Sequence, residues 1–440
     1  MDGTLTSTET AKQIDIEALQ TIVGNDGVIP WDNLNPALQQ TLTHAVTPGT
    51  DLQAVVYPKT QEELAAVVAH ASQHRYGILP YGGGSKLHWG GLVENVHLAV
   101  SLERLNRLTE HAVGDLTVTV EAGMKFEQLQ QTLSEVGQFV AIDPAYPQTA
   151  TIGGILATAD TGSLRQRYRS VRDMVLGISF VRWDGQIAKA GGRVVKNVAG
   201  YDLMKLFTGS YGTLGIITQV TLRLYPMALD SATVILTGDA TAITQASQTL
   251  LSSALTPVAV DLLSPALVEK FKLGSGLGLL VKFESIIESV QQQSSRLLEV
   301  GEKLRLQGGL INTDEQNLWQ QFNQQMSQPA SNSQIVCKIG VSPTVAVEML
   351  NQSQTIGWVH AGVGLGILQF ETATVEQLLS LRKFCEAKGG FLSVLAAPVE
   401  LKQQIEVWGY SGNAFNLMQQ IKQQFDPHSI FSPHRFVGGI

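Results

Sequence analysis

The sequence has only two cysteines, Cys337 and Cys385, among its 440 residues. Two thiols cannot form the several disulfide bonds that hold small secreted proteins together. They also cannot supply the four thiolates that usually bind an iron–sulfur cluster. If the protein serves a reaction that needs such a cluster, we expect the cluster to lie in a partner protein.

The sequence also has fewer basic residues than acidic ones. The chain has 30 Lys and Arg residues against 38 Asp and Glu residues, which gives a formal net charge of −8. Clustered Lys and Arg side chains bind phosphate backbones, so this balance argues against a nucleic acid as the main partner. Charged residues make up 15% and hydrophobic residues 44% of the sequence, which is the composition of a folded protein rather than a disordered one.

Long apolar runs are absent too. We find no stretch of about 18 consecutive apolar residues, so we predict no membrane span. The N-terminal residues include Asp2 and lack the apolar core of a secretory signal, so we expect a cytoplasmic protein. A chain of 440 residues is long enough for two domains, each with a substantial core.

Glycine, by contrast, is abundant, and eight of the 42 glycines lie in three turns that are each beside a predicted strand. The turns are Pro80–Lys86 (PYGGGSK), Thr149–Gly154 (TATIGG) and Gly209–Gly215 (GSYGTLG). Because glycine has no side chain, such a turn can expose its backbone amides to a large or phosphorylated ligand. Three such turns in one half of a chain can meet around a single extended ligand.

The first turn matches neither of two common nucleotide-binding motifs. A Walker loop contains Gly directly before Lys, whereas Ser85 separates Gly84 from Lys86 here. A dinucleotide-binding fingerprint runs directly into a helix, whereas the residues after this turn include Trp89 and two more glycines. Taken alone, Gly82–Ser85 could also be an ordinary tight turn.

The three turns, taken with their surroundings, resemble one family. KNVAGYD at 196–202, followed by GSYGTLGIITQVTLRLYP at 209–226, is similar to the FAD-binding domain of the vanillyl-alcohol oxidase and p-cresol methylhydroxylase (PCMH) class. Within that class, the sequence is most similar to the FAD-binding E subunits of bacterial glycolate oxidases. The resemblance implies an α+β fold with a PCMH-type FAD-binding domain of two subdomains, an α+β cap domain, and a C-terminal tail that returns to the FAD domain.

On this basis we divide the chain into four parts. Residues 1–49 form a lead-in, residues 50–230 the FAD-binding domain, residues 231–415 the cap and subunit-interaction domain, and residues 416–440 the tail. The tail sequence FDPHSIFSPHRF resembles the FDPxGxxNPGR tail of the family, with Ser432 in place of Asn and His434 in place of Gly. For Arg435 in this tail we predict a structural role.

The resemblance also implies the cofactor and its contacts. Positions 81–86 hold no histidine that could tether a flavin, so we expect FAD to be bound noncovalently. Lys196 could place a cation near the flavin, or it could pair with Asp202 instead. The residues that we expect to contact FAD lie in the three turns and are Pro80, Tyr81, Gly82, Gly83, Gly84, Ser85, Thr151, Ile152, Gly153, Gly154, Gly212, Thr213, Gly215 and Ile216.

The cap contains no complete catalytic motif. Related 2-hydroxy acid dehydrogenases have a motif like HxGDGNxH there, and its two histidines bind a metal. The matching run starts at His360 and keeps the glycines, but Val363 replaces the acid, Leu365 the amide and Ile367 the second histidine. An isolated histidine is more often a structural group, so we predict no metal site and assign no catalytic residue. Candidates for a base are Tyr201, His360 and the neighbourhood of Arg435.

The resemblance therefore predicts the FAD-binding subunit of a glycolate oxidase or dehydrogenase, an enzyme that oxidises glycolate to glyoxylate. The expected partners are a catalytic flavoprotein subunit, an iron–sulfur subunit and a small hydroxy acid substrate. Two alternatives stay open. The chain could be a self-sufficient FAD-dependent oxidoreductase of another hydroxy acid or a sugar-type substrate, or a noncatalytic scaffold whose flavin site is vestigial.

Overall fold

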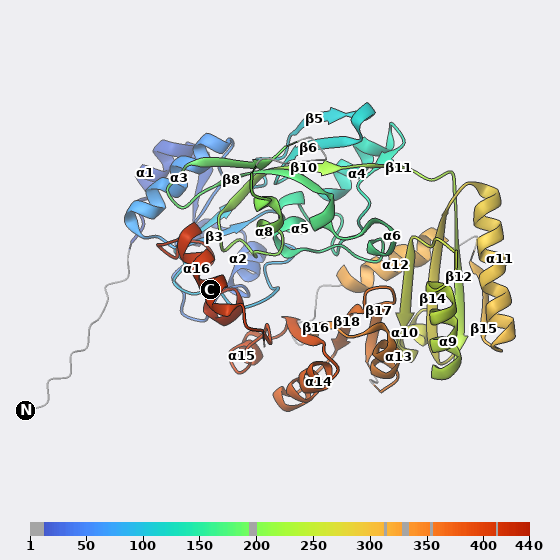
Figure 1. The fold of residues 1–440 in the computed structure, drawn as a ribbon. Helices are drawn as coiled ribbons and strands as arrows, with labels where there is room; N and C mark the ends of the chain where they lie inside the picture. Colours follow the sequence, from blue (N-terminus) through green and yellow to red (C-terminus); the bar gives the residue numbers. More distant parts are fainter. Residues whose placement is uncertain (1–12, 193–199, 312–314, 328–333, 353–354, 411) are drawn as a thin grey trace, which may run out of the picture.

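The computed structural model describes residues 13–192, 200–311, 315–327, 334–352, 355–410 and 412–440 (Figure 1). Its strands form four sheets: two in the first half of the chain, a large one in the second half, and a two-stranded ribbon. No helix in the described ranges is both long enough and apolar enough to cross a membrane.

The first sheet has four strands in the order β1-β2-β4-β3. Its part of the chain contains α1 (Ile16–Val23), β1 (Val28–Pro30), α2 (Pro36–Thr43), β2 (Ala54–Val56), α3 (Gln61–His74), β3 (Ile78–Tyr81) and β4 (Leu98–Ser101). β2, β4 and β3 run parallel, so the chain needs a crossover between β2 and β3, and α3 provides it. α3 begins after Thr60, whose hydroxyl accepts a hydrogen bond of 3.1 Å from the amide of Glu63.

The second sheet has five antiparallel strands in the order β5-β6-β10-β8-β9. Its part of the chain contains β5 (Leu108–Ala112), β6 (Thr117–Glu121), α4 (Phe126–Ser134), β7 (Gln138–Phe139), α5 (Ile152–Thr158), α6 (Arg165–Tyr168), α7 (Val171–Met174), β8 (Val175–Val181), β9 (Ile187–Gly191), α8 (Leu203–Phe207), β10 (Ile216–Arg223) and β11 (Tyr225–Pro226). β7 and β11 form the separate ribbon.

These two sheets share one apolar core. Val56 and Ile78 from the first sheet and Val118 and Val220 from the second are buried in it, together with Leu129 of α4. The glycine-rich turns lie at the ends of these elements: the first follows β3, the second leads into α5, and the third leads into β10. The packing of the two sheets therefore fixes where the three turns can go.

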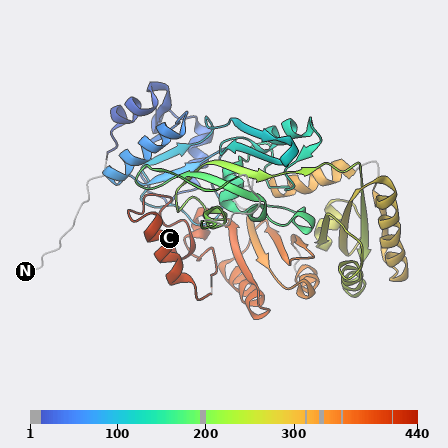
Figure 2. The same cartoon turned by 45° about the horizontal axis from the view of Figure 1, so that its top comes forward.

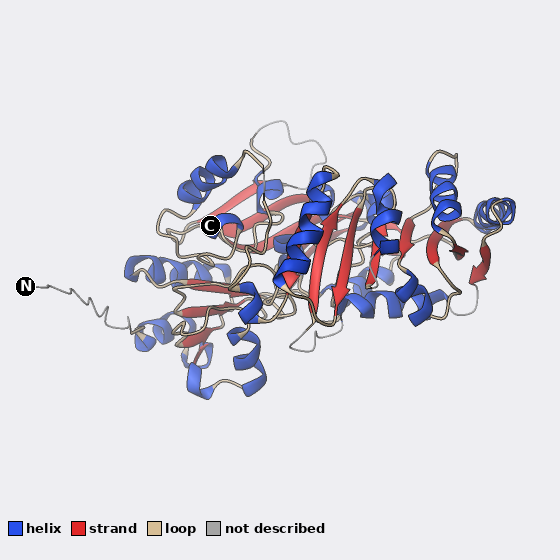
Figure 3. Ribbon diagram, turned by 90° about the horizontal axis from the view of Figure 1, so that it is seen from below, coloured by secondary structure: helices blue, strands red, loops and turns tan. Residues whose placement is uncertain are grey.

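The third sheet has eight antiparallel strands in the order β15-β12-β14-β13-β17-β18-β16-β19. Figure 3 shows its long strands running between helices. The second half of the chain contains β12 (Asp230–Gly238), α9 (Ala240–Leu251), β13 (Ala259–Leu263), α10 (Pro265–Lys270), β14 (Leu277–Ser285), α11 (Ile287–Lys303), β15 (Gln307–Ile311), α12 (Glu315–Ser327), β16 (Ile335–Gly340), α13 (Pro343–Gln352), β17 (Ile356–His360), β18 (Leu365–Phe370), α14 (Val375–Ala387), β19 (Phe391–Ala396), α15 (Val399–Lys402) and α16 (Phe415–Phe425).

The two faces of this large sheet have different neighbours. On one face, side chains such as Val281 and Leu368 pack with Leu297 of α11 and Leu378 of α14. On the other face, Trp358 packs in a separate apolar cluster that also contains Phe322 of α12 together with Trp89 and Tyr211 from the first half of the chain. The second face is therefore the one that meets the first two sheets.

The C-terminal tail returns to the first sheet, where the red end of the chain lies beside the blue N-terminal part in Figure 2. The amide of Ile78 donates to the carbonyl of Ile430 at 2.6 Å, and the amide of Ser432 donates to the carbonyl of Ile78 at 2.9 Å. The α+β fold with a returning tail, which the sequence predicted, is confirmed. The domain boundaries at 49, 230 and 415 stay predictions.

One buried ion pair anchors this tail to the third glycine-rich turn. Lys422 Nζ lies 2.7 Å from Asp426 Oδ2 and donates to the carbonyl oxygens of Thr213, at 2.9 Å, and Phe431, at 3.0 Å. Asp426 also accepts hydrogen bonds from the amides of Ile430 and Phe431. The surrounding protein excludes water from the pair and lowers the pKa of Lys422.

Replacing Lys422 with Met should destabilise the protein, because the Asp426 carboxylate would stay buried without its cation. We expect the free energy of unfolding to fall by about 3–5 kcal/mol. Urea unfolding followed by tryptophan fluorescence measures this, with Lys303→Met on the exposed side of α11 as the matched control. A second change, Asp426→Asn, should recover part of the loss; equal stability of the Lys422→Met and Lys303→Met variants would contradict the assignment.

Candidate functional site

The three glycine-rich turns meet at one place, and three of their glycines, Gly82, Gly83 and Gly212, are needed for that contact. A Cβ atom on Gly82 would overlap the side chain of Thr151, and a Cβ atom on Gly83 would overlap the carbonyl oxygen of Thr149. A Cβ atom on Gly212, whose φ is +75°, would lie 3.1 Å from Pro80 Cγ. The sequence suggested that these glycines give a ligand room, whereas the structure shows that they give the turns room to touch each other.

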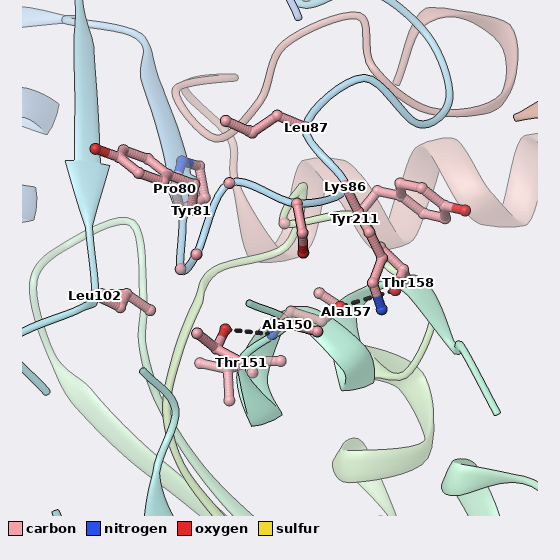
Figure 4. Close-up of a pocket in the computed structure, with 18 of the residues that line it drawn as sticks. Pro80, Tyr81, Lys86, Leu87, Leu102, Ala150, Thr151, Ala157, Thr158 and Tyr211 are labelled. Carbon is pink, nitrogen blue, oxygen red and sulfur yellow. Dashed lines mark hydrogen bonds between the residues drawn. The ribbon is translucent and has the colours of Figure 1, made fainter. Parts of the chain in front are cut away.

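A cavity lies between the turns and encloses about 740 Å³, counting its opening to solvent (Figure 4). All but two of the residues predicted to contact FAD line this cavity; they are Pro80, Tyr81, Gly82, Gly83, Gly84, Ser85, Thr151, Gly153, Gly154, Gly212, Gly215 and Ile216. Their contact with FAD itself stays a prediction.

Ile152 and Thr213 do not line the cavity. Ile152 is buried in the apolar core, and its amide donates to the carbonyl of Met124 at 2.9 Å. The hydroxyl of Thr213 donates to the carbonyl of Ser210 at 2.7 Å. Neighbours that the sequence analysis did not assign to FAD complete the wall; they are Lys86, Leu87, Leu102, Ala150, Ala157, Thr158, Tyr211, Ile217 and Arg435.

The first turn offers unpaired backbone donors to this cavity. In the described part of the chain, the amides of Gly82, Gly83, Gly84 and Ser85 donate no hydrogen bond to another protein group. Successive free amides in a turn form a concave site that attracts anions. In the second turn, by contrast, the amide of Gly153 donates to the carbonyl of Ala122 at 2.8 Å. The first turn is therefore the one suited to a pyrophosphate group.

Buried cations from the C-terminal part hold the chain just after this turn. Arg435 Nη2 donates to the carbonyl oxygens of Leu87 at 2.9 Å and Trp89 at 3.2 Å. Lys402 Nζ donates to the carbonyl oxygens of His88 at 2.6 Å and Gly90 at 2.8 Å. Arg435 thus has a structural role, and it also lines the cavity.

A second cavity, of about 660 Å³, adjoins the first and lies between the first half of the chain and the large sheet. Thr158 and Tyr211 line both cavities, and Figure 4 shows them together with Lys86 on one side of the first cavity. Lys86 Nζ lies 2.6 Å from Asp160 Oδ2, and Asp160 lines the second cavity. This buried ion pair therefore stands between the two cavities.

Charged side chains surround the second cavity. Lys338 reaches it from β16, while Asp143 and Arg165 reach it from the first half of the chain. Loss of contact with water lowers the pKa of Lys338 and of Arg165. Burial raises the pKa of Asp143 to about 8, although the amides of Ser163 and Leu164 donate to its carboxylate at 2.9 Å and favour the charged form.

His360 also lines this cavity, and it is not the isolated histidine that the sequence suggested. Its Nδ1 lies 2.5 Å from Oδ1 of Asp261, which is fully buried. The two residues are directly opposite each other on β17 and β13. Among the described residues, His, Cys, Asp and Glu side chains form no group of three or more that could hold a metal ion. Ile367, which stands where the family has its second histidine, lines the same cavity.

The other candidates from the sequence lie elsewhere. Tyr201 is 87% exposed and lines neither cavity. Lys196 lies outside the described residues. Asp261 and Lys338 were missed because neither belongs to a motif: Asp261 is 99 residues from His360 in the sequence, and only the pairing of β13 with β17 brings the two together.

Comparison with known proteins identifies the cofactor of this chain. Residues 52–191 match a family model described as FAD binding domain. The mitochondrial D-lactate dehydrogenase (cytochrome) of Arabidopsis thaliana is 36% identical over 170 residues, which cover 39% of this chain and 30% of that protein. Glycolate oxidase subunit GlcD of Bacillus subtilis is 34% identical over 173 residues, which cover 39% of this chain and 37% of that protein. The chain thus matches about a third of the length of these relatives.

The whole chain has the fold of a known flavoprotein class. A solved structure of p-cresol methylhydroxylase with substrate bound superimposes with a TM-score of 0.71, covering 96% of this chain and 95% of that one at 16% identity. The chain contains an FAD-binding domain, and FAD is its cofactor. The cavity fits this cofactor, because the free amides of Gly82–Ser85 suit a pyrophosphate and residues of all three turns line the cavity.

Replacing Gly83 with Ala should weaken FAD binding, because the new Cβ atom would push the first turn away from Thr149. Overpacking of this kind costs about 1–3 kcal/mol, which corresponds to a loss of affinity of about 5- to 150-fold. Titration of the FAD-free protein with FAD, followed by flavin fluorescence, measures the effect. Gly114→Ala is the matched control, because a Cβ atom there meets nothing within 4 Å. Equal FAD affinities in the two variants would contradict this prediction.

Proposed function

We propose that this chain is an FAD-dependent oxidoreductase of a small 2-hydroxy acid and serves as the FAD-binding subunit of a glycolate oxidase or dehydrogenase. The observation that carries the proposal is the second cavity, because it adjoins the FAD-binding cavity and brings two cations, Lys338 and Arg165, to one place. Oxidation of a 2-hydroxy acid needs cations for the carboxylate, an acceptor for the hydroxyl proton, and a fixed C–H bond beside the flavin.

Both cations are available to a ligand. Arg165 Nε donates to the carbonyl of Gly162 at 3.2 Å, and in the described part of the chain its two terminal nitrogens have no hydrogen-bond partner. The same is true of Lys338 Nζ. A guanidinium group with two free nitrogens can bind a carboxylate through two parallel hydrogen bonds, and a nearby ammonium group strengthens that binding.

The relatives support the same substrate class. One is named a D-lactate dehydrogenase and another a glycolate oxidase subunit, and lactate and glycolate are both 2-hydroxy acids. The second cavity is also lined by the large apolar side chains of Trp358 and Ile367, which restrict its space. We therefore choose glycolate, the smallest member of the class, as the first substrate to test.

The proposal includes two partner proteins. Electrons that reach the flavin must leave it, and two cysteines cannot bind the usual iron–sulfur cluster. We propose that a catalytic flavoprotein subunit and an iron–sulfur subunit accompany this chain. A second candidate is a self-sufficient oxidoreductase of another hydroxy acid, which would use the same cations and histidine of the second cavity without partner subunits.

Anaerobic mixing of the FAD-containing chain with a panel of 2-hydroxy acids tests the function. We expect glycolate or a close analogue to bleach the visible flavin absorbance once, because no acceptor subunit is present. A panel of sugar lactones serves as the comparison. Rapid multiple turnovers by the chain alone would favour the self-sufficient enzyme, and a flavin that no compound of either panel reduces would count against both candidates.

Replacing Lys338 with Met should weaken binding of the substrate carboxylate more than it slows the chemical step. A hydrogen bond to a charged group contributes about 1.5–3 kcal/mol, so we expect the concentration for half-maximal flavin reduction to rise by about 10- to 150-fold. Stopped-flow reduction at several glycolate concentrations separates this constant from the maximum rate. Lys303→Met, far from the cavity on α11, should leave both values unchanged. An unchanged half-maximal concentration in Lys338→Met would rule out this role.

A further inference from the structure

We propose that His360, positioned by Asp261, accepts the hydroxyl proton of the substrate, and that this pair does the work for which related enzymes use a metal. The inference rests on the proposed function, since it assigns a residue to the reaction in the second cavity. At the wall of that cavity, His360 Nδ1 lies only 2.5 Å from Asp261 Oδ1.

The contact determines which nitrogen of His360 can accept a proton. An ionised carboxylate only accepts hydrogen bonds, so Nδ1 must carry the hydrogen that lies between the two residues. In neutral imidazole, Nε2 then keeps its lone pair. In the described part of the chain, Nε2 has no hydrogen-bond partner. The acceptor nitrogen is therefore free while the rest of the ring is held in place.

Asp261 is suited to support a positive charge on His360. Its carboxylate is fully buried, and its second oxygen, Oδ2, has no partner among the described residues. A buried and incompletely paired carboxylate stabilises a protonated imidazole next to it, because the attraction between them is only weakly screened by water. The neighbouring charged groups of the cavity are Asp143, Asp160, Arg165 and Lys338, so cations for the substrate lie in the same space as the base.

The donors around His360 do not add up to a metal site. Leu365, which is directly opposite His360 on β18, and Ile367, on the same face of that strand, are both apolar and line the cavity. Each stands where the related dehydrogenases have a polar residue. In the described part of the chain, the His360–Asp261 pair belongs to no group of three or more His, Cys, Asp or Glu side chains that could hold a metal ion, so it suits a proton acceptor better than a catalytic metal.

The proposed reaction breaks one O–H bond and one C–H bond of the substrate. The hydroxyl O–H bond of the substrate breaks and its proton moves to His360 Nε2, while the hydrogen on the same carbon leaves with its electron pair to an oxidant of the flavin class. A C=O bond forms, and the product is a 2-oxo acid. His360 returns its proton to water when the product leaves.

His360→Gln and Asp261→Asn, each in the full chain with FAD, test the inference. General-base catalysis typically contributes about 100- to 10,000-fold, so we expect His360→Gln to lower the maximum rate of flavin reduction by at least about 100-fold. Asp261→Asn keeps the imidazole but can donate a hydrogen bond to Nδ1, which would place the hydrogen on Nε2, so it should also slow the reaction. His74→Gln at the end of α3 is the matched control and should change nothing.

Two measurements separate a base from a structural histidine. The first is the affinity for oxalate, which has two carboxylates but no hydroxyl or C–H bond to react; calorimetry should show a change of less than about threefold in His360→Gln, because Lys338 and Arg165 still bind the anion. The second is chemical rescue: added imidazole should restore part of the rate in His360→Ala. A structural role predicts parallel losses of rate and oxalate affinity and no rescue.

The possible results are distinct. Slow reduction with intact oxalate binding and rescue by imidazole supports the inference. Reduction of His360→Gln at a rate within about threefold of the unmodified protein, or loss of rate together with oxalate binding and without rescue, overturns it while the proposed function stands. If no 2-hydroxy acid reduces the unmodified protein, the proposed function fails, and the inference fails with it. Should His360→Gln not fold, Asp261→Asn and the rescue of His360→Ala decide the question.

Discussion

The site depends on one steric constraint: the glycine-rich turns can touch only where a side chain is missing. Gly82 and Gly83 lie directly against Thr149 and Thr151, and Gly212 lies against Pro80. Because these contacts use up the space that a Cβ atom would need, the turns are held at a fixed separation, and the cavity between them has a fixed shape. The amide of Leu87 closes the first turn by donating to the carbonyl of Gly84 at 3.2 Å, and the amides of Gly82–Ser85 stay free to bind an anion.

The sharp turns also create a need for hydrogen-bond donors to backbone carbonyl oxygens. A chain that turns sharply leaves carbonyl oxygens without partners, and buried carbonyls must be satisfied. Cations from the C-terminal part meet this need: Arg435 and Lys402 donate to the carbonyls that follow the first turn, and Lys422 donates to a carbonyl of the third. Burial, and to a smaller extent the charge of Arg435, lower the pKa of Lys402 to about 7. Lys422 and Arg435 of the tail thus help to hold the turns that line the first cavity.

The sequence allowed prediction of those features that depend on local rules. Three features were sufficient to predict the fold and the place of the first cavity. They are the glycines at sharp turns, the strands beside those turns, and the amino-acid sequence of the third turn. The reason for each glycine was not predictable, since Gly83 is needed by Thr149, 66 positions away in the sequence, and not by a ligand. The pair formed by His360 and Asp261 was not predictable either, because it is created by the pairing of two strands that no local pattern connects.

The register of the large sheet brings the ionisable side chains of its strands to the second cavity. Asp261, His360 and Leu365 are directly opposite one another across three strands, and Lys338 is opposite Ile367 in the adjacent row. Successive residues of a strand point to opposite faces, so a shift of one residue in β17 would move His360 from the cavity to the helix-covered face. The charged groups therefore reach the cavity only in the observed register, and this register buries the apolar residues Val359 and Leu368 on the other face. Because the same pairing satisfies the core and places the charges, the site needs no separate stabilisation: burial of the apolar face fixes the positions of His360, Asp261 and Lys338.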